Sequence, residues 1–113
     1  MMNKRMVLFC LIGLTFSVAV AVAHNNGKKE IILHGGKKGN ITFPHHRHHD
    51  IVTDCMVCHK DFPKEPGALQ ASKKAGTLKK KQVMNKTCLK CHRARKKAGE
   101  AYGPVSCSGC HVK

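Results

Sequence analysis

The sequence predicts a small α+β domain in which an amino-terminal two-stranded β-hairpin is followed by short helices wrapped around a non-protein interior. Three observations lead to this prediction. Two short runs of β-branched and apolar residues flank a glycine-rich stretch, and one cysteine–histidine motif occurs three times. The chain also has no tryptophan and few large apolar side chains. A domain this small and this poor in apolar residues needs a cofactor, a metal or cross-links to be stable.

The amino terminus has the features of a secretion signal. Lys4 and Arg5 precede an uncharged, mostly apolar stretch, residues 6–23, which ends in Ala-Val-Ala. This pattern predicts cleavage before His24 and a single mature domain, residues 24–113, in the periplasm or outside the cell. An uncleaved membrane anchor is the alternative, because the apolar stretch is near the short limit for a spanning helix. After cleavage we expect no stable membrane insertion.

The elements of the mature domain follow in order from local patterns. Residues 30–33 and 41–43 read as strands, and the intervening 35–40 reads as a turn. Pro44 suits the first turn of a helix over the histidine-rich segment that follows. The stretch 61–67 holds two prolines and a glycine and is expected to be a loop.

Short helices are predicted after this loop. Residues 68–75 and 78–85 favour two helices separated by Gly76. Thr87 is expected to cap a further helix that runs to about Ala98 and ends at Gly99.

Six cysteines outside the signal all fall into one pattern, C-x-x-C-H, which is the motif of c-type haem attachment. Two thiols three positions apart on a helical turn can each form a thioether to one porphyrin, and the next histidine can bind its iron. The motifs are Cys55-Met-Val-Cys58-His59, Cys88-Leu-Lys-Cys91-His92 and Cys107-Ser-Gly-Cys110-His111. The sequence therefore predicts three covalently attached haem c groups, whose porphyrins supply the interior of a haem-dominated α+β domain.

Two other uses of six cysteines were weighed against this prediction. Three disulfides would suit a small exported domain, and paired C-x-x-C units can hold zinc. Neither use requires a histidine directly after the second cysteine, which is present in all three motifs. A zinc site would also pair the units and leave one of the three unpaired.

The sixth ligand of each iron separates an electron carrier from an enzyme or gas-binding protein. Candidates are concentrated in the run His45-His46-Arg47-His48-His49, with His24 and His34 outside it. On a helix, His45 with His48 and His46 with His49 each share a face. Spacing alone leaves both pairs open, and a solvated basic turn or an adventitious metal site is the alternative for histidines that bind no haem.

The three motifs, the short chain and the segment Phe43-Pro44-His45-His46-Arg47-His48 resemble the cytochrome c7 family, over nearly all of residues 30–113. These are triheme relatives of cytochrome c3. The resemblance implies that His45 and His48 are distal ligands, the first for the haem of the first motif and the second for the haem of the second motif. It also implies an amino-terminal hairpin and an electron-transfer role between quinol oxidation and terminal or outer-membrane reductases.

One position departs from the family pattern. The family's remaining distal histidine, which serves the last haem, lies four residues before the second motif, and this chain has Met84 there. Methionine is a haem ligand that raises the reduction potential. We expect His/Met ligation for this haem, with His34, His46 and His49 as rival ligands and apolar packing as the alternative role for Met84.

Charge narrows the partners. The chain carries +15, of which Lys4 and Arg5 account for two, so residues 24–113 carry +13. Such a charge steers acidic partners, and many of the lysines surround the second motif. Export and the lack of aromatic residues among the lysines argue against nucleic acid. The sequence thus predicts an electron carrier, not an enzyme, that docks acidic redox proteins, and the alternative is a reductase or gas-binding protein with one open haem.

Overall fold

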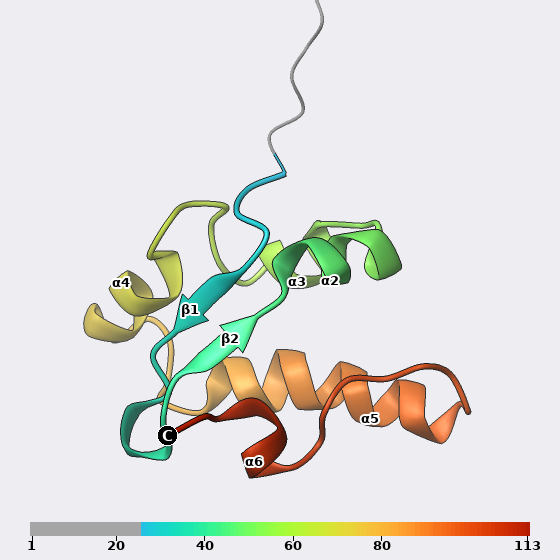
Figure 1. Ribbon diagram of the computed structural model, residues 1–113. Helices are drawn as coiled ribbons and strands as arrows, with labels where there is room; N and C mark the ends of the chain where they lie inside the picture. Colours follow the sequence, from blue (N-terminus) through green and yellow to red (C-terminus); the bar gives the residue numbers. More distant parts are fainter. Residues whose placement is uncertain (1–25) are drawn as a thin grey trace, which may run out of the picture.

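The computed structural model describes residues 26–113, so the predicted signal segment and His24 lie outside the described residues. Figure 1 shows a hairpin in the middle, with α4 on one side, α2 and α3 on the other, and α5 below. The elements are β1 (Ile31–Leu33), η1 (Gly36–Lys38), β2 (Ile41–Phe43), α2 (His45–Val52), α3 (Met56–His59), α4 (Ala68–Lys74), η2 (Met84–Cys88), α5 (Leu89–Lys97) and α6 (Cys107–Cys110).

The predicted hairpin is confirmed. Strands β1 and β2 pair antiparallel with Ile31 opposite Phe43. The connection contains the 3₁₀ turn η1 and Gly39, whose φ of 97° is open to glycine but strained for other residues. A Cβ on Gly39 would also overlap the carbonyl of Val112, which forms a bridge with Asn40. The carboxyl terminus is therefore held against the hairpin turn.

Helix α2 begins directly after Pro44, as the sequence predicts. It ends at Val52, followed by Thr53 at a φ of 59°. The N–H of Thr53 donates to the carbonyl of His49 at 2.9 Å, which closes the last turn. This helix carries all four histidines of the run, and it is followed after a short turn by the first motif on α3.

The segment between the first two motifs agrees with the sequence prediction in its first part only. The loop at 61–67 and helix α4 are confirmed, but the second predicted helix is not formed over its first half, because Leu78 and Lys79 are not helical. The helix begins instead at Gln82 and continues through η2 into α5.

The prediction that Thr87 caps the third helix is wrong. Thr87 lies inside η2, a π-helical turn in which the N–H of Leu89 bonds to the carbonyl of Met84. A capping residue needs an extended backbone before the helix, whereas the chain here is already helical at Val83. The predicted end of this helix is confirmed, because Gly99 adopts a φ of 74° just after Ala98.

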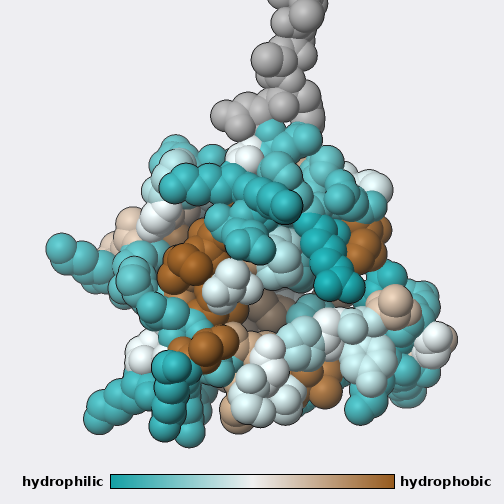
Figure 2. Space-filling view, in the orientation of Figure 1, coloured by the Kyte–Doolittle hydropathy of each residue, from teal (hydrophilic) through white to brown (hydrophobic). Residues whose placement is uncertain are grey.

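Protein side chains do not fill the interior of the described part of the chain. Leu78, at 7% exposure, is the one buried residue among residues 26–113, and no described polar or charged residue is buried. Figure 2 shows apolar side chains around the middle of one face, with hydrophilic ones at its margin. This α+β arrangement of a hairpin and short helices leaves space for groups that are not protein. Within residues 26–113, no helix has both the length and the apolar character needed to cross a bilayer.

Candidate haem-binding site

Each of the three motifs lies on a helical turn. In the first, the N–H of His59 donates to the carbonyl of Cys55 at 2.9 Å, and α6 shows the same bond from His111 to Cys107 at 3.0 Å. The second motif spans the end of η2 and the start of α5. The paired thiols and the following histidine are thus set on one turn in each motif, as thioether attachment to a single porphyrin requires.

The six cysteines of the described chain are all free thiols. Burial raises the pKa of the Cys58, Cys88 and Cys110 thiols, one in each motif. The described residues also contain no cluster of three or more histidine, cysteine or acidic side chains placed to hold a metal ion. The described residues therefore contain no preformed zinc site.

The histidine of each motif donates its Nδ1 proton to a backbone carbonyl. His59 donates to Phe62 at 3.3 Å, His92 to Pro104 at 2.7 Å and His111 to Gly39 at 2.9 Å. A carbonyl only accepts, so these bonds place the proton on Nδ1 and leave Nε2 as a lone-pair donor. This second-shell arrangement is typical of histidines that bind a metal through Nε2.

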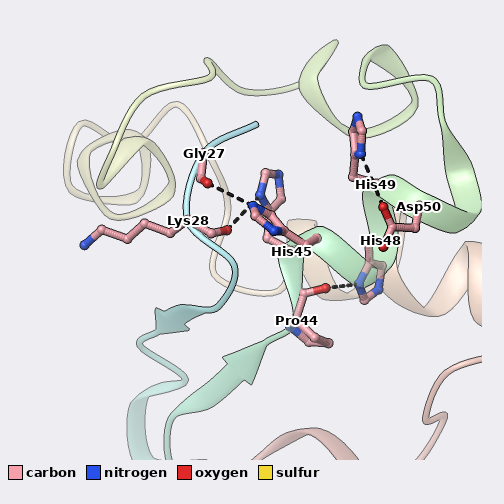
Figure 3. Close-up of polar contacts among 8 residues, drawn as sticks. Gly27, Lys28, Pro44, His45, His48, His49 and Asp50 are labelled. Carbon is pink, nitrogen blue, oxygen red and sulfur yellow. Dashed lines mark hydrogen bonds and ion pairs between the residues drawn. The ribbon is translucent and has the colours of Figure 1, made fainter. Parts of the chain in front are cut away.

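The four histidines of α2 differ in which ring nitrogen makes the polar contact. His45 donates from Nδ1 to Lys28 at 3.2 Å, and His48 donates from Nδ1 to Pro44 at 2.9 Å. His46 instead uses Nε2, which donates to Gly27 at 2.9 Å. His49 lies with its Nδ1 3.7 Å from Asp50 and points to the opposite side of α2 from His48 (Figure 3). Two histidines of the run therefore have the tautomer of an Nε2 ligand together with a backbone acceptor.

These two histidines lie opposite the histidines of the first and second motifs. The ring centroids of His45 and His59 are 6.2 Å apart, and those of His48 and His92 are 6.1 Å apart. Two imidazoles that bind one metal from opposite sides, each at about 2 Å, have centroids roughly 6 Å apart. The centroid spacing of each pair therefore matches that of two imidazoles on opposite sides of one iron.

Met84 lies in a different setting. It is the first residue of η2, one helical turn before Cys88, and its side chain is 37% exposed. Single π-helical turns within α-helices are rare and occur often at functional sites. The wide turn therefore connects this candidate ligand to Cys88, the first cysteine of the second motif.

A cavity of about 590 Å³ opens between the loop after the first motif and the segment that leads into the second. Phe62, Leu78 and Val83 supply apolar surface, and Lys60, Lys86 and Lys90 supply positive charge. This volume lies in the range of about 300–1,000 Å³ that is usual for cofactor and ligand sites.

Sequence reasoning missed the backbone groups that orient the histidines. The carbonyl of Pro44 could have been found, because it lies one helical turn before His48. Phe62 could have been found as well, because it lies only three positions after His59. Its ring contacts that of His59 edge-on, with the ring centroids 5.5 Å apart. Gly103 and Gly35 carry no local signal, yet a Cβ on either would overlap the ring of His92 or His111 respectively.

Comparison with known proteins agrees with this geometry. The family profile "Cytochrome c7 and related cytochrome c" matches residues 41–112. A cytochrome c7 of Geobacter metallireducens is 35% identical over 77 residues, which are 68% of this chain and 69% of the relative. A cytochrome c3 of Desulfuromonas acetoxidans is 29% identical over 84 residues, 74% of this chain and 98% of the relative.

Solved structures share the fold. The triheme cytochrome PpcA of Geobacter sulfurreducens superimposes with a TM-score of 0.55 and 30% identity, over 76% of this chain and all of PpcA. The cytochrome c7 PpcB of the same organism gives a TM-score of 0.52 and 34% identity over the same shares. The hairpin and short helices are therefore the framework of these triheme cytochromes.

Proposed function

Because this chain belongs to the cytochrome c7 family, we propose that it is a periplasmic electron-transfer protein in which protein atoms bind all three irons on both faces. As a member of this family it carries three covalently attached haem c groups and is an electron carrier, not an enzyme. The observation that carries the proposal is the pairing of His45 with His59 and of His48 with His92, with ring centroids 6.2 and 6.1 Å apart.

The haem ligands follow from the contacts of each histidine. The attachment residues are Cys55, Cys58, Cys88, Cys91, Cys107 and Cys110. His59, His92 and His111 bind the irons from one side. His45 completes the first-motif haem, and His48 completes the second-motif haem. Their Nδ1 bonds to backbone carbonyls support this assignment over His46, whose Nε2 is already a donor to Gly27.

Met84 completes the third-motif haem in this proposal. Its position four residues before Cys88 is the one that holds a histidine in the family pattern. The rival His34 is adjacent to Gly35, which packs against the Nδ1–Cε1 edge of the His111 ring. A sixth ligand would approach from beyond Nε2, so the position of Gly35 on the Nδ1 side of His111 argues against its neighbour His34.

The protein's residues hold the ligand rings in place rather than make or break bonds. When bound, haem iron accepts and releases single electrons. With both faces of each iron bound by protein atoms, no site would remain for a substrate, and backbone hydrogen bonds would hold the ligand rings in position when the charge on the iron changes. The signal-like sequence of residues 1–23 supports export to the periplasm.

Redox proteins are the partners of an electron carrier, and we propose that those of this chain are acidic. Lys90, Arg93 and Lys97 follow at helical spacing along α5, are exposed, and continue a basic row from the exposed Lys86 in η2. No acidic residue occurs between Met84 and Lys97. This row, the α5 basic face, lies beside the second motif, where a docked partner comes close to the haem bound by His92.

Reversing charge on the α5 basic face should slow association with an acidic redox protein. For Lys90→Glu/Arg93→Glu, we expect the rate of electron exchange with an acidic flavodoxin to fall by about tenfold at low ionic strength. The matched control Lys37→Glu/Lys38→Glu makes the same change in net charge on η1. Stopped-flow measurements at rising salt check the prediction, because screening should remove the difference. Equal slowing by both double variants would show that only net charge matters.

The number of attached haems and the absence of an open coordination site on any iron test the proposal as a whole. The exported protein should have the mass of residues 24–113 plus three haems, and carbon monoxide should leave its reduced spectrum unchanged. A mass short of three haems contradicts the assignment of the motifs. Rapid carbon monoxide binding by one haem would show that one iron is open, as in a reductase or gas-binding protein.

A further inference from the structure

The two proposed bis-histidine pairs differ in the angle between their rings. The planes of His45 and His59 are nearly perpendicular, at 87°, whereas those of His48 and His92 are closer to parallel, at 29°. Each ring is turned by its own Nδ1 bond to a backbone carbonyl, and the four carbonyls come from different segments of the chain. The fold therefore sets the two angles independently.

The orientation of His92 depends on the loop that follows α5. Gly103 lies flat against the imidazole, so that a Cβ there would be 2.6 Å from Nε2, and Pro104 accepts the Nδ1 proton. The loop is tied back to α5 because Arg95 donates to the carbonyl of Ala101 at 2.9 Å and pairs with Glu100 at 3.3 Å. Residues 99–104, here called the His92 loop, therefore hold this ring in its orientation.

On the opposite side, the ring of His48 is fixed by two neighbours from its own segment. Phe43 packs against it with centroids 4.4 Å apart, and Pro44 accepts its Nδ1 proton. His59 is oriented differently, by the carbonyl and the ring edge of Phe62. The near-parallel pair is therefore held from both sides of the iron gap.

The angle between two axial imidazoles changes the electronic structure of ferric iron. Parallel rings donate π density into the same d orbital, which raises that orbital, separates it from its partner and stabilises the ferric hole. Perpendicular rings donate into different orbitals, which stay close in energy. With the same ligand types, the parallel pair therefore gives the lower potential and a rhombic paramagnetic resonance signal, and the perpendicular pair gives a strongly anisotropic one.

We infer that Gly103 and the His92 loop are positioning elements that hold His92 near-parallel to His48 and so give the second-motif haem the lowest potential of the three. This inference rests on the proposed function, because it takes His45/His59 and His48/His92 as ligand pairs. It adds an order of potentials that the ligand types alone do not supply, since both haems have two histidines. Electrons then leave first from the haem beside the α5 basic face.

Paramagnetic resonance of the fully oxidised holoprotein, followed through a redox titration, tests the inference. We expect one rhombic signal and one strongly anisotropic signal from the bis-histidine haems, with the rhombic signal the last to vanish on reduction. Identical signals from both haems, or an anisotropic signal that vanishes last, would overturn the inference. A high-spin ferric signal would instead show that a ligand pair is wrong, which is a failure of the proposed function.

Gly103→Ala identifies the residue responsible. The added methyl group should turn or displace His92, shift the rhombic signal and the lowest potential, and leave the anisotropic signal in place. Gly76→Ala is the control for general destabilisation, because an alanine is strained there by the φ of 77°, whereas no atom lies within 4 Å of the added Cβ and no proposed ligand is displaced. If Gly103→Ala does not mature, Arg95→Ala loosens the His92 loop and should broaden the same signal, with Lys37→Ala, exposed on η1, as its control. Unchanged rhombic signals in a matured Gly103→Ala or in Arg95→Ala would refute the role of the loop.

Discussion

Replacing Met84 by histidine lowers the highest of the three midpoint potentials. A thioether favours ferrous iron, whereas imidazole is the stronger donor and stabilises ferric iron. We expect a fall on the order of 0.1–0.3 V, a fraction of the roughly 0.8 V that axial ligands span. Potentiometry of the holoprotein measures it, and the weak charge-transfer band that sulfur-ligated ferric haem shows at the red end of the visible spectrum should disappear.

Met56→His is the matched control for this substitution. Met56 is also exposed, at 53%, and lies between the cysteines of the first motif. The substitution Met56→His introduces the same side chain without replacing a proposed sixth ligand. The midpoint potentials of this variant should therefore stay within the range of the unmodified protein. An unchanged highest potential in Met84→His would remove Met84 from the ligands and leave the third haem to another residue or to an open site.

Removing His48 should open one haem and spare the other two. In His48→Ala the second-motif iron loses the ring that lies 6.1 Å from His92, and no other side chain of α2 has the same Nδ1 anchor facing that gap. We expect about one third of the reduced haem to bind carbon monoxide, together with a high-spin ferric signal. Absorbance titration with carbon monoxide gives the fraction directly.

His46→Ala separates ligand loss from a general effect of shortening a histidine on the same helix. His46 is part-buried like His48 and donates to Gly27 from the opposite ring nitrogen. Its removal should leave all irons six-coordinate and carbon monoxide unbound. If His46→Ala and His48→Ala exchanged their behaviour, the register of α2 on the haems would be shifted, and the pair His46 and His49 would be the ligands instead.

These two experiments bear on the same physical question, which is how a chain of such small core keeps three irons in different states. The polypeptide encloses little by itself, because Leu78 alone is buried among residues 26–113. Rigidity comes instead from backbone carbonyls that hold imidazole rings. In the proposed ligation, one haem differs in ligand identity and the other two differ in ligand angle, so a single small domain would offer an electron partner three distinct potentials.

Local elements were predictable because their causes are local. Pro44 and the histidine run form α2, the β-branched runs form the hairpin, and Gly99 follows the end of α5 as its backbone freedom requires. Thr87 was misread because its preference for a cap is weak against a helix already under way from Gln82. The π-helical turn at residues 84–88 has no recognisable sequence signature.

The sequence by itself determined the number and chemistry of the cofactors, because covalent attachment depends on cysteines and a histidine that are neighbours on one helical turn. It also narrowed the candidate distal ligands to the histidine run, the outlying His24 and His34, and Met84. Only the tertiary structure decided which nitrogen of each ring donates to a carbonyl and at what angle the paired rings lie. The carbonyls that settle this come from Lys28, Gly39 and Pro104, which are distant in sequence from the rings they orient, so no local pattern could have shown them.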